Sequence, residues 1–272
     1  MTAKDGKKPD TKDPWTSNLG KIGLQRYTVE EIAARDVHLK IQAVHDLNIE
    51  EAQTETVWTY QRRVVVYFGR LDTRGETSKT SSHVLTLYLA EHPDVVDFAG
   101  SVLELGAGPG LPGLAAAQIC RKAEKVVMSD NKDLVLKLLR KNIDKNFPKE
   151  RERFHCAHLQ WGDDVTSFRE RHGRFDVILG ADLAYFRPDI PLLIDTAKEL
   201  LSEKPSAVFV LAYKDRTRKK THNFEWEIYQ AAKRCGLEWN EVDWRGLPRW
   251  DEMVDPCDVK NLHLLLIKHR AT

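Results

Sequence analysis

From residue 100 to the end of the chain, short apolar segments alternate with longer segments of helical spacing, and this alternation limits the fold more than any other feature. The pattern begins with SVLEL (101–105) and LPGLAAAQICRKA (111–123), and it continues with KVVMSD (125–130) and KDLVLKLLRKNIDKN (132–146). Short apolar runs predict buried strands, and amphipathic segments predict the helices that cover them. Regular alternation of strand and helix indicates a parallel sheet with helices on both faces.

Five further strands and two further helices complete the predicted core. The strands are expected at 153–161 (RFHCAHLQW), 175–182 (FDVILGAD), 206–213 (SAVFVLAY), 237–244 (LEWNEVDW) and 261–269 (NLHLLLIKH), and the helices at 189–203 and 223–236. The last two strands are joined without a helix, so they should pair antiparallel, because parallel neighbours need a longer crossover. We therefore predict an α/β fold with a doubly wound, Rossmann-like seven-stranded sheet, mostly parallel with the last strand antiparallel, and helices on both faces.

The chain ahead of this core divides into two parts. Residues 1–22 are rich in Lys, Asp, Pro and Thr and poor in large apolar side chains, which is typical of a disordered charged tail. Residues 23–99 are expected to form an N-terminal extension packed on the core, with a helix near 28–37, one or two strands within 56–71 and a buried helix near 81–93. Residues 100–272 then form the core domain.

Composition excludes several classes of function. A net charge of +1 over 272 residues gives no field over the whole domain that would attract nucleic acid or an anionic membrane. The four cysteines form no C-x-x-C pair, and His155 and His158 should project from opposite faces of a strand, so no metal site is expected. No segment has the length and apolar character of a membrane span, so we expect no membrane contact and a cytoplasmic or nuclear location.

A glycine-rich turn, ELGAGPG (104–110), follows the first core strand and indicates a ligand at the carboxyl ends of the strands. The dinucleotide fingerprint G-x-G-x-x-G fails because Leu111 stands where its third glycine should be. Glu104 would repel a pyrophosphate but suits the sulfonium of S-adenosylmethionine. Asp130, at the end of the second strand, can accept hydrogen bonds from ribose hydroxyls. A packing turn and a helix N-cap at Asp130 remain the structural alternatives.

The chain resembles the seven-β-strand, class I S-adenosylmethionine-dependent methyltransferases, and within them family 16, which includes calmodulin-lysine, chaperone and elongation-factor lysine methyltransferases. The matching motifs are VLELGAGPGLPG (102–113), SD (129–130), LQWG (159–162) and DLAY (182–185), and the resemblance covers roughly residues 57–269. It implies cofactor-binding roles for Glu104, Gly106, Gly108, Asp130 (ribose) and Trp161 (adenine), and we add Ala181, at the end of the fourth strand. One position departs from the family pattern, since Lys79 stands where a tryptophan is common.

In this family the D-x-x-Y element, here Asp182 and Tyr185, resembles a site for a substrate lysine. Methyl transfer needs an uncharged amine, whereas a free lysine with a pKa near 10.4 is mostly protonated at neutral pH. Desolvation and a neighbouring sulfonium would lower that pKa, Asp182 can orient the amine, and the ring of Tyr185 can face the cationic groups. These two residues are the predicted catalytic pair. The structural alternative is that Asp182 caps a turn and Tyr185 packs under the next helix.

The sequence thus predicts a protein-lysine N-methyltransferase whose substrate is a protein with an accessible lysine, such as a translation factor or chaperone, and whose chain is a monomer. The runner-up is a nucleic-acid (RNA) methyltransferase, whose best support is the basic segment KDRTRKKTH (214–222) as a phosphate-binding patch. The same segment could equally recruit an acidic protein surface through Lys219 and Lys220, or be a solvated loop. Leu183 and Ala184 replace the prolines that shape a base-binding slot in amino methyltransferases of nucleic acids, which disfavours the RNA reading. A third reading is a binding protein without turnover, which the presence of Lys79 leaves open.

Overall fold

The computed structural model describes residues 38–41, 55–59, 62–66 and 79–270, except residues 185, 217–223, 249, 253 and 255. For the three short N-terminal segments, only the backbone is described. The predicted tail at 1–22 and the predicted helix at 28–37 lie outside the described residues. The division into a tail, an extension and a core therefore stays a prediction.

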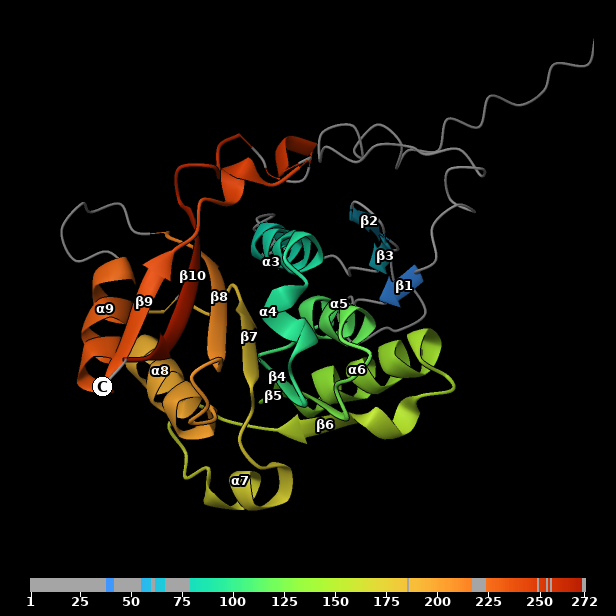
Figure 1. The fold of residues 1–272 in the computed structure, drawn as a ribbon, viewed down its shortest axis with the longest axis horizontal. Coiled ribbons are helices and arrows are strands. Elements are labelled where there is room, and N and C mark those ends of the chain that lie inside the picture. The colour runs from blue at the N-terminus through green and yellow to red at the C-terminus, as the bar shows by residue number, and fades with distance from the viewer. Residues whose placement is uncertain are drawn as a thin grey trace, which may run out of the picture.

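The core is a seven-stranded sheet with the strand order β6-β5-β4-β7-β8-β10-β9 (Figure 1). Its strands are β4 (Ser101–Leu105), β5 (Lys125–Asp130), β6 (Phe154–His158), β7 (Val177–Ala181), β8 (Val208–Lys214), β9 (Leu237–Glu241) and β10 (Leu262–His269). The strands from β6 to β8 are parallel to one another, and β10 runs antiparallel to both β8 and β9. The predicted topology, including the antiparallel last strand, is confirmed.

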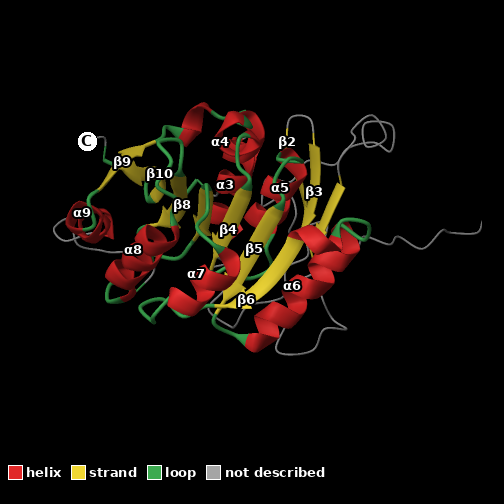
Figure 2. Cartoon of the chain, turned by 60° about the horizontal axis from the view of Figure 1, so that its bottom comes forward, coloured by secondary structure: helices red, strands yellow, loops and turns green. Residues whose placement is uncertain are grey.

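Helices cover both faces of this sheet, as its continuous apolar strands require (Figure 2). The helices are α3 (Lys79–Glu91), α4 (Asp94–Asp97), α5 (Leu111–Ile119), α6 (Asp133–Asn146), α7 (Thr166–His172), α8 (Asp189–Leu200) and α9 (Phe224–Arg234). Short 3-10 turns lie at Arg151–Arg153, Trp244–Gly246 and Trp250–Glu252. Neighbouring residues of β4 belong to opposite cores, because Val102 packs with α3, α5 and α6 whereas Leu103 packs with α8 and α9.

A second, small sheet precedes α3 in the chain and has the order β1-β3-β2. Its strands are β1 (His38–Ile41), β2 (Glu55–Thr59) and β3 (Arg62–Val66), with β2 antiparallel and β1 parallel to β3. Strand β1 lies beside α6 (Figure 1). The sequence predicted one or two strands in this region and missed β1. No helix within the described part of the chain is long and apolar enough to cross a bilayer.

Candidate functional site

The order of the central strands creates a crevice at one edge of the sheet. The chain continues from β4 to β5 on one side and later adds β7 on the other side of β4. Because these strands are parallel, their carboxyl ends at Leu105, Asp130 and Ala181 lie at the same edge. Open α/β sheets bind ligands at such a switch point. The predicted site residues follow directly from these strand ends.

The glycine turn after β4 depends on left-handed backbone at Gly106, Gly108 and Gly110, whose φ values are 52°, 51° and 88°. At Gly110 the packing is also tight, since an added Cβ would lie 2.2 Å from Met128 Cε, which would have to move. At Gly108 an added Cβ would meet no atom within 4 Å. Gly110 therefore packs closely against the hydrophobic core, whereas Gly108 borders open space.

Asp130 fastens this turn to the end of β5. Its Oδ2 accepts a hydrogen bond from Gly108 N at 3.2 Å, and its Oδ1 accepts one from Lys132 N at 3.0 Å. The N-cap position of α6 is Lys132, so Asp130 does not occupy the N-cap that the structural alternative assigned to it. The carboxylate thus lies at the strand end beside the open turn, where the sequence analysis expects the ribose.

Glu104 lies beneath the turn rather than on its open side. It is 2% exposed, and its Oε2 accepts a hydrogen bond at 3.0 Å from the N–H of Gly113 in the first turn of α5. Burial raises the pKa of this carboxyl well above its ordinary value, more than the hydrogen bond from Gly113 lowers it. Burial thus opposes the charged form of Glu104, which is the form that the predicted attraction to a sulfonium requires. A contact between Glu104 and a cofactor stays a prediction.

The loops after β4, β6 and β7 meet around Gly106. A Cβ at Gly106 would lie 3.2 Å from Trp161 Cζ2 and 2.6 Å from Leu183 Cδ2. The backbone N–H of Gly162 donates to Thr196 Oγ1 at 3.2 Å, which fixes the Trp161 loop to α8. The fold therefore brings the predicted adenine neighbour, the glycine turn and the residue after Asp182 together.

Asp182 has an unusual backbone, with a φ of 57° that makes it the only non-glycine residue of positive φ in the described part of the chain. Its N–H donates to Ala212 O at 2.8 Å, which extends the pairing of β7 with β8 by one residue. The carboxylate is almost fully buried and forms a two-pronged ion pair with Arg216, with both N···O distances at 2.8 Å. The predicted partner Tyr185 lies outside the described residues. Strained backbone at a strand end is typical of functional sites.

Arg216 was not among the predicted site residues, because in the sequence it is one of several basic residues in the segment 214–222. Two basic side chains of that segment are described, and both are paired within the chain. Arg216 binds Asp182, and Lys214 Nζ lies 2.5 Å from Asp258 Oδ1. Asp215, the second residue of the segment, accepts a hydrogen bond from Phe224 N at 3.2 Å through its Oδ2. Lys219 and Lys220, with the rest of 217–223, lie outside the described residues.

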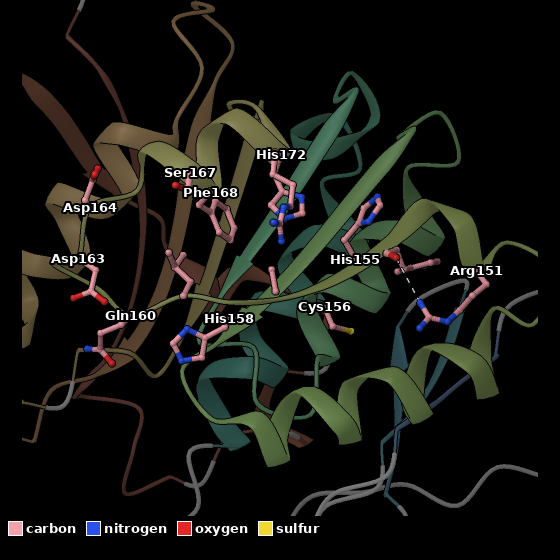
Figure 3. Close-up of a pocket in the computed structure, with 14 residues that line it drawn as sticks. Arg151, His155, Cys156, His158, Gln160, Asp163, Asp164, Ser167, Phe168 and His172 are labelled. Atoms are coloured by element: carbon pink, nitrogen blue, oxygen red, sulfur yellow. Dashed lines mark hydrogen bonds between the residues drawn. The ribbon is translucent and has the colours of Figure 1, made fainter.

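A separate cavity of about 620 Å³ runs along the edge strand β6 and helix α7 (Figure 3). None of the predicted site residues lines it. Its lining includes His155 and His172, whose ring centroids lie 5.7 Å apart. Burial, and then the charges of His155 and Lys125, lower the pKa of His172 to about 4. Within the described residues, no three side chains of His, Cys, Asp or Glu are grouped as metal ligands.

Comparison with solved structures shows the fold. A protein of Streptococcus mutans described as a SAM-dependent methyltransferase aligns with a TM-score of 0.55 and 17% identity, over 80% of this chain and 56% of that one. The methyltransferase domain of bacterial CtHen1-C aligns with a TM-score of 0.50 and 13% identity, over 71% of this chain and all of that one. The Rossmann-like methyltransferase fold predicted from the sequence is confirmed.

Comparison with curated proteins finds lysine methyltransferases. The chain is 34% identical over 142 residues to protein N-lysine methyltransferase METTL21A of Xenopus tropicalis, covering 52% of this chain and 60% of that protein. It is 35% identical over 130 residues to EEF1A lysine methyltransferase 3 of Mus musculus, covering 47% and 52%. The matched region thus spans about half the length of these relatives. A family model described as lysine methyltransferase matches residues 42–229, so the chain belongs to the lysine methyltransferase family, as its motifs predicted.

Proposed function

We propose that this protein is an S-adenosylmethionine-dependent methyltransferase that modifies a lysine side-chain amine of a protein substrate. The observation that carries the proposal is the arrangement at one sheet edge of a lysine methyltransferase family member. There the open glycine turn at Gly108, the carboxylate of Asp130 and the buried carboxylate of Asp182 follow three neighbouring strands.

The residues at this edge fit an adenosyl ligand. The open space at Gly108 admits close approach to the backbone, and Asp130 lies beside it with carboxylate oxygens that can accept from ribose hydroxyls. The indole of Trp161 lies next to Gly106 and offers a flat apolar surface to a purine. When bound, S-adenosylmethionine supplies an electrophilic methyl group and leaves as a neutral thioether after transfer.

The chain itself must bind, orient and desolvate the acceptor amine. Asp182 is almost fully buried, and its backbone is fixed to β8, so its carboxylate presents a fixed acceptor for the N–H groups of a lysine. The lysine loses a proton to solvent before transfer, because only its lone pair can form the new N–C bond. We further propose that Tyr185 borders the same amine. Alignment supplies most of the acceleration, and no dedicated strong base is required.

Names of the relatives suggest the first acceptor to test. One of them is called EEF1A lysine methyltransferase 3 in Mus musculus. We propose elongation factor 1A as the first candidate acceptor and a wider class of translation factors and chaperones as the second.

The test combines labelled S-adenosylmethionine with purified protein and either elongation factor 1A or a cell extract. Label on a protein band that resists nuclease and is lost with protease is expected, and Asp182→Ala should abolish it. Asp195→Ala is the matched control. Asp195 on α8 is a half-exposed carboxylate that also pairs with an arginine, Arg234 on α9, but it is not one of the predicted site residues. Label that nuclease removes would favour the RNA reading. Cofactor binding without any incorporation would favour a binding protein.

A further inference from the structure

The carboxylate proposed to receive the acceptor amine already holds a cation of its own chain. Arg216 donates from its two terminal nitrogens to the two oxygens of Asp182, at 2.8 Å each. The side chain of Asp182 is 7% exposed, whereas that of Arg216 is 30% exposed. Parallel charge-assisted hydrogen bonds of this kind are among the strongest that a carboxylate accepts. Both oxygens of Asp182 are therefore engaged.

Asp182 does not depend on Arg216 for its position. Its backbone N–H donates to Ala212 O at 2.8 Å, and its backbone φ of 57° sets the direction in which its Cβ leaves the end of β7. A residue keeps such a sparsely populated φ only where the surrounding structure holds it. The backbone and Cβ of Asp182 would thus remain in place if the guanidinium moved away, and the buried carboxylate would stay at the end of β7.

The acceptor reaches this carboxylate as a cation, because a lysine in water has a pKa of about 10.4 and carries a proton at neutral pH. Its ammonium and the guanidinium of Arg216 have the same charge and the same kind of hydrogen-bond donors. A buried carboxylate left without a cation is strongly unfavourable. Exchange of one cation for the other keeps Asp182 paired while the acceptor binds, and the neutral amine that forms before transfer can still donate an N–H to it.

We propose that Arg216 is an internal competitor of the acceptor, whose guanidinium occupies the position on Asp182 that the acceptor's ammonium takes when the protein substrate binds. This inference rests on the proposed function, since it requires Asp182 to receive the acceptor. The Arg216 side chain would leave by rotation towards solvent, where nearly a third of it is already exposed, and this movement would also break its weaker bond to Lys214 O at 3.4 Å. A neutral hydroxyl or amide cannot replace the guanidinium without leaving Asp182 unpaired. Arg216 therefore selects acceptors that arrive as cations.

The experiment measures initial rates of methyl incorporation at saturating labelled S-adenosylmethionine, with cell extract titrated by total protein concentration as the source of acceptor. Arg216→Ala should lower the half-saturating extract concentration by at least about fivefold, because the variant leaves the buried Asp182 without a cation until the acceptor binds. Arg216→Lys should give a smaller decrease, since lysine keeps the charge but loses the second donor. Arg234→Ala is the matched control, because its ion pair with Asp195 joins α9 to α8, and it should change nothing.

Calorimetric titration with S-adenosylmethionine and thermal denaturation accompany each variant. Arg216→Ala should leave the affinity for the cofactor unchanged. If the melting temperature of Arg216→Ala falls below that of the wild type, Arg216→Gln is used in its place. A higher or unchanged half-saturating concentration, or a lower maximal rate, would overturn the inference and make Arg216 a positioning residue for Asp182. If wild-type protein and every Arg216 variant bind the cofactor yet incorporate no label, the proposed function itself fails. If Arg216→Ala incorporates label and the wild-type protein does not, Arg216 competes so strongly that it blocks the acceptor under these conditions, which would support the inference.

Discussion

Replacement of Gly110 by alanine tests whether the glycine turn is held by packing or only by its backbone. The left-handed backbone at φ 88° costs an L-residue about 1–2 kcal/mol. The new Cβ would lie 2.2 Å from Met128 Cε and 2.7 Å from Leu139 Cδ2. Overpacking of a core costs about 1–3 kcal/mol, and we expect the lower half because methionine is flexible. Gly110→Ala should therefore lower the free energy of unfolding by about 2–4 kcal/mol.

Gly108→Ala is the matched comparison, because Gly108 has a similar left-handed φ of 51° but open space beside it. Gly108→Ala should lower the free energy of unfolding only by the cost of the left-handed backbone, about 1–2 kcal/mol. Its methyl group enters the space assigned to the cofactor, so affinity for S-adenosylmethionine should fall at least about tenfold, or about 1.4 kcal/mol. Urea denaturation and calorimetric titration measure the two effects. Equal stability losses in the two variants, or unchanged cofactor affinity in folded Gly108→Ala, would refute the reasoning.

Three further predictions concern buried ionisable groups. The folded-state pKa of His172 is lowered from 6.5 to about 4, so its contribution to stability is present above pH 6.5 and is lost as the pH falls through about 4. This shift is worth about 3 kcal/mol, and we expect about half of it because the ring lines a cavity that solvent can enter. His172→Gln should flatten that part of the pH profile of urea denaturation. Glu104→Ala leaves the buried N–H of Gly113 unpaired and should lower the free energy of unfolding by about 2–4 kcal/mol. Glu104→Gln keeps an acceptor and should lower it by less than about 1 kcal/mol, as measured by thermal denaturation. Asp176→Asn should lower the free energy of unfolding by about 1–3 kcal/mol in the same assay. Asp176 accepts a hydrogen bond from Gly100 N at 2.9 Å and lies 2.8 Å from Lys204 Nζ, so the variant weakens both contacts. A loss of less than about 0.5 kcal/mol would contradict this prediction.

The large elements could be predicted because each has its own local signal. The buried parallel strands are continuous apolar runs, and the intervening helices carry amphipathic spacing, so the order of the sheet followed from the alternation. Strand β1 and helix α7 gave no such signal. HLKI has only four residues, and TSFRERH has a single apolar side chain, Phe168. Both elements are stabilised by neighbours rather than by their own pattern.

The gathering of the candidate site residues at one edge of the sheet was predictable, but the contacts of their side chains were not. Alternation along β4 places Glu104 on the same face as Val102, beneath α5, and this signal could have shown that Glu104 points into the core. The pair of Asp182 and Arg216 joins residues 34 positions apart, and no local pattern marks it. The available signal was topological, because β7 and β8 are neighbours in a parallel sheet and opposite charges directly after each strand can meet.

The assignment of this chain as a lysine N-methyltransferase is tested most directly by the chemical identity of the labelled residue. Acceptor protein labelled by the wild-type chain is hydrolysed in acid, and its amino acids are separated beside those from the Asp182→Ala reaction. The label should appear in methylated lysine, and it should be absent from the variant sample. Label in methylated arginine or histidine, in a base-labile ester or in nucleosides would contradict the assignment.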